Sequence, residues 1–309
     1  MTVASTAARP RTEVEIGLLA GSFAVLLWGL GPLLVKGSGL STPTIVGIRY
    51  IIAAPVLHGV ARWRGARVDL GVYRRAFVPG LLFGASIITG FAAVRNTSVT
   101  NATLIGNMMP VVVLLFARFG MRQNIPNRQF VAVGAAVVGV VTVVVGAGSS
   151  GEAALWGDLI AFSNVFVWSA YFLRTKRLRD SGENVWAMLA AVSTICLVVV
   201  SPACLLVADD LDAVDLRGIG FIVAIVLGPG VIGHGLMTWS SKHLDVTISS
   251  LLTLGSPVVA AFGAWVWLDE SITVVQAVGA GVVLGALGAI GLSTRVQAVR
   301  EAALSDPPE

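Results

Sequence analysis

The sequence predicts an all-α polytopic membrane protein with ten transmembrane helices, arranged as two inverted five-helix repeats. Of the 309 residues, 56% are hydrophobic and only 12% are charged, whereas a soluble domain carries about 25% charged residues. The hydrophobic residues form ten long runs, and basic residues gather in alternate connections between them. A weak duplication relates the two halves of the chain. The composition excludes a soluble enzyme and an intrinsically disordered chain.

Each hydrophobic run is long enough for a membrane-spanning helix. Crossing roughly 30 Å of hydrocarbon takes about 20 helical residues at 1.5 Å per residue. The runs are apolar throughout and do not alternate with period two, which indicates helices and not barrel strands. The shortest polar separation, at Arg95 and Asn96, divides the third run from the fourth. The predicted spans are residues 16–35, 43–61, 76–94, 98–117, 129–148, 154–173, 185–207, 218–239, 246–268 and 272–292.

The charge distribution predicts the orientation of these spans. With the N-terminus inside, 17 of the 21 Lys and Arg residues fall in inner segments. The outer connections carry acidic residues instead, in the segment 209–215 and at Asp269 and Glu270. Because basic residues are retained on the cytoplasmic side, both termini are predicted to be cytoplasmic, with the protein in the plasma or inner membrane. The net charge of +4 therefore reflects orientation, and no nucleic-acid partner is expected.

The two halves of the chain match each other at fixed offsets. An offset of 140 residues aligns Trp28 with Trp168, and an offset of 147 aligns Pro110 with Pro257. Because each half holds five spans, an odd number, the halves must insert with opposite orientations, as in many secondary transporters. The predicted divisions are a cytoplasmic tail at residues 1–15, a first repeat at 16–148, a second repeat at 154–292 and a cytoplasmic tail at 293–309.

Parts of both halves resemble a known family. The segment Leu251–Glu270, LLTLGSPVVAAFGAWVWLDE, followed by Gln276, Gly279 and Gly281, resembles the second repeat of the EamA group of the drug/metabolite transporter superfamily. In the first half, Trp28, Gly29, the pair Arg49 and Tyr50 and the Pro110 segment resemble the first repeat. The resemblance covers roughly residues 16–293. It implies ten helices around a central cavity and transport of small metabolites such as amino acids, often outward. Gln123 departs from the pattern, because such repeats often have an acidic residue at the position opposite Glu270.

Polar and aromatic side chains inside the spans are the candidates for substrate binding, because polar groups are costly against lipid. Asn164, Trp168 and Tyr171 form one stripe of the sixth span, and Trp28 is the counterpart of Trp168. His234 is the only histidine well inside a span, and a buried imidazole can bind substrate or carry a proton. Helix packing is the alternative role for each of these side chains.

Prolines interrupt three of the spans. Each proline removes a backbone hydrogen bond, and the freed carbonyl beside a polar side chain is able to contact substrate at mid-membrane. The alternative is a kink that only shapes the helix. The predicted breaks are Pro110, Pro229 and Pro257, and the neighbouring polar residues that complete the candidate substrate site are Asn107, Thr253 and Ser256.

Three further features of the spans bear on function or packing: a charged residue, the lack of deep carboxylates and a stripe of glycines. Arg49 lies six residues into the second span and is expected to snorkel to the surface, with attraction of carboxylate substrates as the alternative. No carboxylate lies deep in a span, since Asp158 is about one turn from a helix end, and this disfavours proton coupling through a membrane carboxylate. Coupling through His234, another coupling route and facilitated transport remain as alternatives. The small-residue stripe Gly281, Gly285 and Gly288 allows close packing within the bundle or in a homodimer.

The predicted function is secondary transport of small metabolites, amino acids or related compounds, by alternating access around a midplane cavity, with export as the expected direction. The sequence contains no GxSxG, HExxH or GxxxxGK[ST] motif and no pair of mid-membrane aspartates. No enzymatic activity, cofactor or metal site is therefore expected. The alternatives are a receptor or assembly protein without transport activity and, as a weaker candidate, an intramembrane enzyme. A receptor would not explain the inverted duplication.

Overall fold

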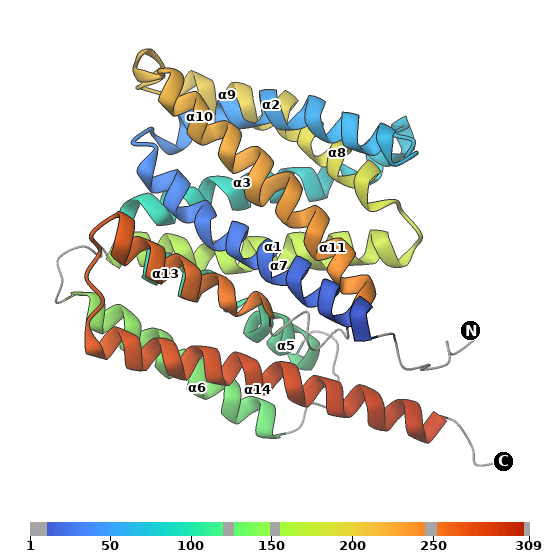
Figure 1. The fold of residues 1–309 in the computed structure, drawn as a ribbon, viewed down its shortest axis with the longest axis vertical. Coiled ribbons are helices and arrows are strands. Elements are labelled where there is room, and N and C mark those ends of the chain that lie inside the picture. Colours follow the sequence, from blue (N-terminus) through green and yellow to red (C-terminus); the bar gives the residue numbers. More distant parts are fainter. Residues whose placement is uncertain (1–10, 120–126, 149–154, 245–251, 306–309) are drawn as a thin grey trace.

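The computed structural model of the chain describes residues 11–119, 127–148, 155–244 and 252–305, and these ranges are helical without any strand. The helices of the first half are α1 (Arg11–Gly37), α2 (Thr42–Trp63), α3 (Leu70–Asn96), α4 (Val99–Gly106), α5 (Met109–Phe119) and α6 (Asn127–Gly148). The second half contains α7 (Leu155–Asp180), α8 (Val185–Ile195), η1 (Cys196–Val200), α9 (Ser201–Leu206), η2 (Leu211–Ala213), α10 (Leu216–Ile225), η3 (Val226–Gly233), α11 (His234–His243), α13 (Gly255–Trp267) and α14 (Val274–Ser305). Figure 1 shows them as a bundle of roughly parallel and antiparallel rods.

The helices make the chain a multi-pass membrane protein. Among the described residues, seven helical segments are long and apolar enough to cross a bilayer, and two shorter apolar segments lie at Gly255–Trp267 and Val274–Ile290. The helix α7, which carries Asp158 and Asn164, is not among the seven. The number of ten spans therefore stays a prediction. The helix α14 continues to Ser305, beyond the predicted end of the tenth span.

Polar residues in the short connections determine where several helices begin. The side chains of Ser41, Asp69 and Ser98 accept hydrogen bonds from backbone N–H groups in the first turns of α2, α3 and α4. Asp215 caps α10 in the same way, through the N–H of Gly218 at 2.7 Å. Each cap satisfies a donor that the helix itself leaves unpaired. The brief polar break between the third and fourth spans is therefore sufficient to start a new helix.

The fourth and ninth spans are interrupted at equivalent positions. The helix α4 ends at Gly106 and α5 begins at Met109, one residue before Pro110. In the second half the chain turns at Leu254, just before α13 and three residues before Pro257. The offset of 147 residues that aligns the two prolines also aligns Asn107 with Leu254. The two halves therefore resemble each other in the position of this helix break as well as in sequence.

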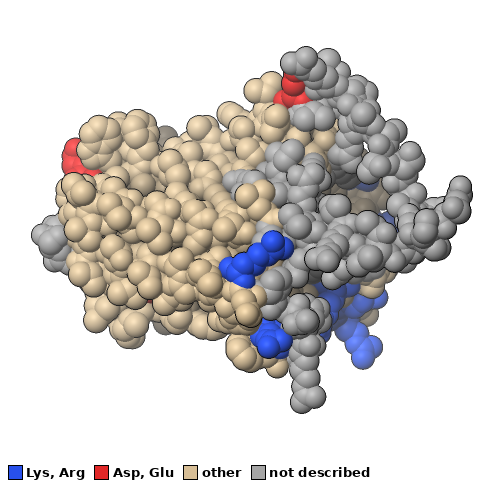
Figure 2. Space-filling view, turned by 90° about the horizontal axis from the view of Figure 1, so that it is seen from below, with Lys and Arg blue, Asp and Glu red and all other residues tan. Residues whose placement is uncertain are grey.

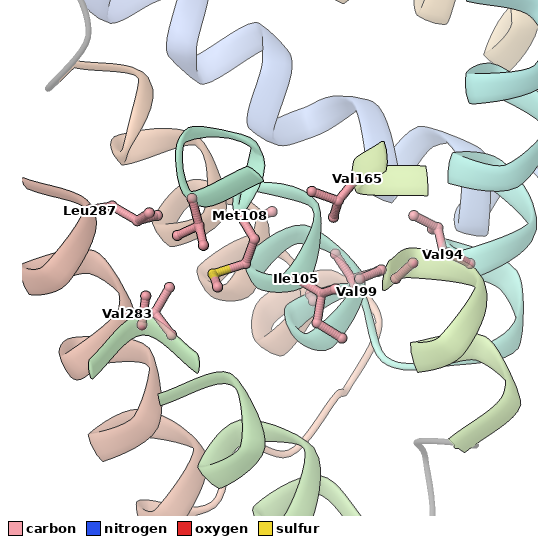
Figure 3. Packing of buried hydrophobic residues seen from close by; sticks show 14 of the residues in the cluster. Val94, Val99, Ile105, Met108, Val165, Val283 and Leu287 are labelled. Carbon is pink, nitrogen blue, oxygen red and sulfur yellow. The ribbon is translucent and has the colours of Figure 1, made fainter. Parts of the chain in front are cut away.

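The halves pack mainly against each other. The most extensive contacts in the bundle join α6 to α14 and α3 to α7, and α1 packs against α13 and α11. Each of these pairs combines one helix from each half. Figure 3 shows the buried core where they meet: Ile105 and Met108 of the first half lie among Val165 of α7 and Val283 and Leu287 of α14. The two halves therefore share one core.

The contact between α6 and α14 depends on two glycines. A Cβ atom at Gly279 would lie 2.8 Å from the Gly139 carbonyl oxygen, and one at Gly139 would lie 3.0 Å from the Gly279 oxygen. Gly281 and Gly285 are exposed, and an added Cβ at either would meet nothing within 4 Å. The predicted stripe is thus directed away from α6, while Gly279 makes the close approach. A homodimer through the stripe stays a prediction.

The two ends of the bundle carry opposite charges. The helix α1 begins and α14 ends at the same end (Figure 1), where exposed Arg62 lies in the last turn of α2 and exposed Arg64 and Arg67 follow it. At the opposite end, the exposed residues include Asp212 and Asp269. Figure 2 shows the blue basic side chains toward one end and a red acidic group at the other, with a second red group beside the grey residues. We call these the basic end and the acidic end.

Replacing Gly279 by Ala is expected to lower the free energy of unfolding by about 1–3 kcal/mol, because the new methyl group overpacks against the backbone of α6. The matched control on the same helix is Gly281→Ala, which should be neutral or slightly stabilising because alanine favours the helix by about 1 kcal/mol. Thermal unfolding of both variants in detergent measures the difference. Equal stability of the two variants would contradict the close packing described here.

Candidate functional site

A small cavity lies between the halves of the bundle. It is bordered by α2 and α3 of the first half and by α8, η3 and α11 of the second half. Its volume of about 40 Å³ has room for a few water molecules, but not for a metabolite. We call this the central cavity, and its lining residues are Arg49, Tyr50, Ala53, Leu57, Phe83, Leu189, Val192, Ser193, Val226, Gly230, Val231 and His234.

Arg49 supplies the charge in this cavity. Its side chain is only 9% exposed, so it does not snorkel to the surface as the sequence suggested. Its guanidinium carbon lies 5.3 Å from the ring centre of Phe91 and 5.7 Å from that of Tyr50. Its Nε atom is buried without a hydrogen-bond partner among the described residues. The aromatic rings face the cation, but they do not provide an acceptor for its N–H group.

Tyr50 places a second polar group beside Arg49. The residue is 1% exposed, and its hydroxyl lies beside the Cys196 thiol, a weak partner that gives its own hydrogen to the Gly80 carbonyl at 3.3 Å; the hydroxyl makes no stronger hydrogen bond with a described residue. Ser193, by contrast, already donates its hydroxyl to the carbonyl of Ala190 at 2.8 Å. Buried polar groups are normally paired, so the Arg49 Nε–H without an acceptor and the weakly paired hydroxyl of Tyr50 indicate a place where a ligand is able to complete the hydrogen bonding.

His234 is the predicted site residue that lines the central cavity. It stands at the end of η3, and its Nδ1 atom lies 2.9 Å from the carbonyl oxygen of Pro229. Trp28 donates its Nε1–H to the same oxygen at 3.1 Å, and its ring meets the imidazole edge to face at 5.3 Å. Because a carbonyl only accepts, Nδ1 carries the hydrogen and Nε2 of the neutral ring is left as an acceptor.

Trp168 and Tyr171, the aromatic residues of the predicted stripe, contact Phe83, and Phe83 lines the central cavity. This ring lies 5.0 Å from Tyr171 and 6.2 Å from Trp168, measured between ring centres. Asn164, the third member of the stripe, accepts hydrogen bonds from Ser86 and Thr89 of α3. The amide oxygen therefore joins α7 to α3, while the aromatic side chains form an apolar wall behind Phe83.

The remaining predicted residues lie away from the central cavity. Asn107 donates its side-chain amide to Thr103 within its own helix, at 2.8 Å. Thr253 and Ser256 do not line the cavity, and neither do Pro110 and Pro257. Pro257 instead borders a second hollow of about 260 Å³, which lies among α4, α13 and α14 and has almost entirely apolar walls.

At the acidic end, three carboxylates of the second half contact polar groups of the first half. Glu270 is 4% exposed and receives hydrogen bonds from Lys36, at 2.6 Å, and from the backbone N–H of Val99, at 2.9 and 3.0 Å. The carboxylate therefore sits at the N-terminus of α4, where the helix dipole favours a negative charge. Asp269, which lies after α13, has a left-handed backbone conformation with φ of 54°. This turn directs Glu270 toward α4.

The other two carboxylates repeat this arrangement. Asp158, 4% exposed, accepts hydrogen bonds from Thr97 at 2.8 Å and from Asn101 at 3.1 and 3.2 Å. Asp210 accepts from the backbone N–H and hydroxyl of Ser41 and from the hydroxyl of Thr44. Partial burial opposes ionisation of Asp210, but these hydrogen bonds hold its pKa below the usual value. We call Asp158, Asp210, Glu270 and their partners the carboxylate network.

The sequence matches a known family in both halves. The model of the EamA-like transporter family matches residues 15–145 and residues 155–294. The chain belongs to the EamA-like transporter family. Membership confirms the resemblance found in the sequence and accounts for the duplication. It makes the protein a membrane transporter of the drug/metabolite transporter superfamily, and members of the family are transporters and not enzymes.

Other comparisons add the fold alone to this EamA-like assignment. A solved crystal structure whose description states no function superposes with a TM-score of 0.63, covering 91% of this chain and 98% of its own. The two sequences are 19% identical. Curated protein sequences give no significant match.

Three residues of this EamA-like site were not among the candidates chosen from the sequence. They are Tyr50, Phe83 and, as a buried group, Arg49. The signal for Arg49 was present, because a charged residue in an apolar run is costly unless it faces a cavity or a partner. Tyr50 follows it directly. Nothing in the sequence distinguishes Phe83 from the other phenylalanines of the spans.

Glu270→Gln is expected to lower the free energy of unfolding by about 2 kcal/mol, because the partly buried ammonium of Lys36 loses its counter-charge and the N-terminus of α4 loses its carboxylate. The control is Glu183→Gln. Glu183 pairs with Arg75 at the same 2.6 Å, but the side chains of that pair are 18% and 47% exposed, against 5% and 28% for Glu270 and Lys36. The control should therefore cost less than about 1 kcal/mol. Similar losses in both variants would refute a special contribution of Glu270.

Proposed function

We propose that this EamA-like protein is a secondary transporter that moves small metabolites across the membrane by alternating access around the central cavity. The cavity carries the proposal, because both halves form its walls and its polar groups come from Arg49, Tyr50 and His234. Ligand sites in proteins usually enclose roughly 300–1,000 Å³. A cavity of about 40 Å³ therefore has to widen before it accepts a metabolite, and relative motion of the halves would provide the space.

The carboxylate network supports the same mechanism. Its three carboxylates all join the second half to the first half at the acidic end. Contacts of this kind hold one end of the bundle closed, and their separation would be needed to open that end. The helix breaks at Asn107 and Leu254 supply positions at which the helices of each half are able to bend. Ten spans, inverted halves and outward transport complete the proposal.

The substrates we expect are amino acids or related compounds, in agreement with the resemblance to the EamA group. The test is flux through purified protein in liposomes, measured with a panel of labelled amino acids and other small metabolites. Measurements with and without a pH gradient examine proton coupling. Release of the same compounds from cells that express the protein examines the direction. Absence of flux for every compound, from protein that remains folded, would contradict the proposal.

His234→Ala is expected to reduce flux about fivefold, equivalent to the loss of about one hydrogen bond, because the imidazole lines the cavity and holds the Pro229 carbonyl. The control is His243→Ala, since His243 lies at the end of α11 and does not line the cavity. Thermal unfolding verifies that both variants remain folded. Unchanged flux in His234→Ala would remove this residue from the site.

The predicted orientation places the acidic end outside the cell and both termini in the cytoplasm. The only two cysteines, Cys196 and Cys204, are buried, so they should contribute little background labelling. A membrane-impermeant thiol reagent is expected to label Ser271→Cys, an exposed position at the acidic end, in intact cells. It should label the exposed position Arg67→Cys only after permeabilisation. The reverse pattern would overturn the orientation.

A further inference from the structure

We propose that the central cavity binds the carboxylate of a monoanionic substrate through Arg49, with the apolar remainder of the substrate against the aromatic wall. The inference deepens the proposed function and rests on it for the transport of this ligand. Binding itself is testable without transport. The argument depends on a buried cation, on a weakly paired hydroxyl beside it and on the apolar character of the other lining side chains.

Arg49 is a cation that lacks a counter-charge. Burying a charge is costly unless it is paired and hydrogen-bonded, yet no acidic side chain lines the cavity and no described residue accepts from its Nε atom. The rings of Phe91 and Tyr50 offset part of this cost through cation–π contact. A bound anion would offset much more. The charge of the site therefore favours a negative ligand.

The chemistry of the donors identifies a carboxylate. A guanidinium presents its N–H groups in a planar fork that fits the two oxygens of a carboxylate. The hydroxyl of Tyr50, whose neighbour Cys196 is only a weak partner, is able to donate to a remaining lone pair, because each carboxylate offers about four acceptor positions. The Arg49 guanidinium and the Tyr50 hydroxyl thus match the acceptors of one small anion.

The rest of the lining restricts the ligand further. Arg49 is the only Lys or Arg among the lining residues, which favours a single negative charge over a phosphate dianion. None of the described lining residues is a carboxylate that could pair with a substrate ammonium, so among the amino acids and related compounds proposed above the site favours a related monocarboxylate over a zwitterion. Phe83, backed by Trp168 and Tyr171, offers an apolar surface to an aromatic or aliphatic group.

Binding of four matched compounds to the wild-type protein distinguishes a carboxylate site from a site for neutral, zwitterionic or cationic ligands. The four compounds share a phenylethyl skeleton: 3-phenylpropionate, its neutral amide, phenylalanine and phenethylamine. 3-Phenylpropionate is expected to raise the unfolding temperature in a concentration-dependent way, because a ligand that binds only the folded state stabilises it. Its affinity should exceed that of the amide about 10- to 100-fold, as expected for charge-assisted hydrogen bonds. Equal effects of the acid and the amide would overturn the proposal.

Variants then assign the binding to Arg49. Arg49→Gln should abolish the stabilisation by 3-phenylpropionate without lowering the unfolding temperature of the free protein, because it removes an unpaired buried charge. Arg49→Lys should retain weaker binding. Tyr50→Phe removes only a hydroxyl group and should weaken binding several-fold. The control Arg217→Gln changes an exposed arginine and should leave binding unchanged.

The outcomes distinguish the site from the transport function. Stabilisation of Arg49→Gln equal to that of the wild type would overturn the site. If Arg49→Gln fails to fold, the comparison of acid with amide and the Tyr50→Phe variant still decide. Carboxylate binding without flux in liposomes would refute transport and retain the site. Flux of neutral or cationic compounds that is unaffected by Arg49→Gln would retain transport and overturn the carboxylate site.

Discussion

The bilayer gives its helices no hydrophobic driving force to pack against one another, since lipid tails are as apolar as the side chains they surround. Close backbone packing and polar contacts must therefore hold this molecule together. Gly139 and Gly279 allow α6 and α14 to approach closely, and the carboxylate network ties the halves at the acidic end. The same constraint requires a partner for every freed backbone group. The carbonyl oxygen of Pro229, for example, lies within hydrogen-bond distance of Trp28 Nε1 and His234 Nδ1.

Because buried polar groups need partners, the hydrogen bonds of each buried charged side chain indicate its role. Glu270 and Asp158 are saturated with donors from the opposite half, so their role in this conformation is to join helices. Arg49 is equally inaccessible to solvent but has no acceptor at its Nε atom. This contrast is the reason that Arg49, and not Glu270 or Asp158, is proposed to bind a ligand.

Hydropathy located most of the long apolar helices, because the membrane imposes a length and a composition on each span, but α7 is not among the seven segments long and apolar enough to cross a bilayer. The offsets between Trp28 and Trp168, and between Pro110 and Pro257, revealed the duplication. Side-chain burial was harder to predict. Glu270 belongs to a connection that suggests exposure, but the turn at Asp269 directs it inward. The burial of Arg49 depends on α8 and η3, which are distant from α2 in the sequence and meet it only through packing.

The carboxylate network is asymmetric between the two halves. Its three carboxylates belong to the second half, and the groups that donate hydrogen bonds to them belong to the first half. At the offsets that align the halves, Glu270 corresponds to Gln123 and Asp158 to Leu18, and neither residue is able to carry a negative charge. If the halves exchanged conformations to face the other side, these ion-dipole and ion-pair contacts would not re-form at the basic end. The two facing states would then differ in free energy, and the unloaded transporter would rest with its acidic end closed.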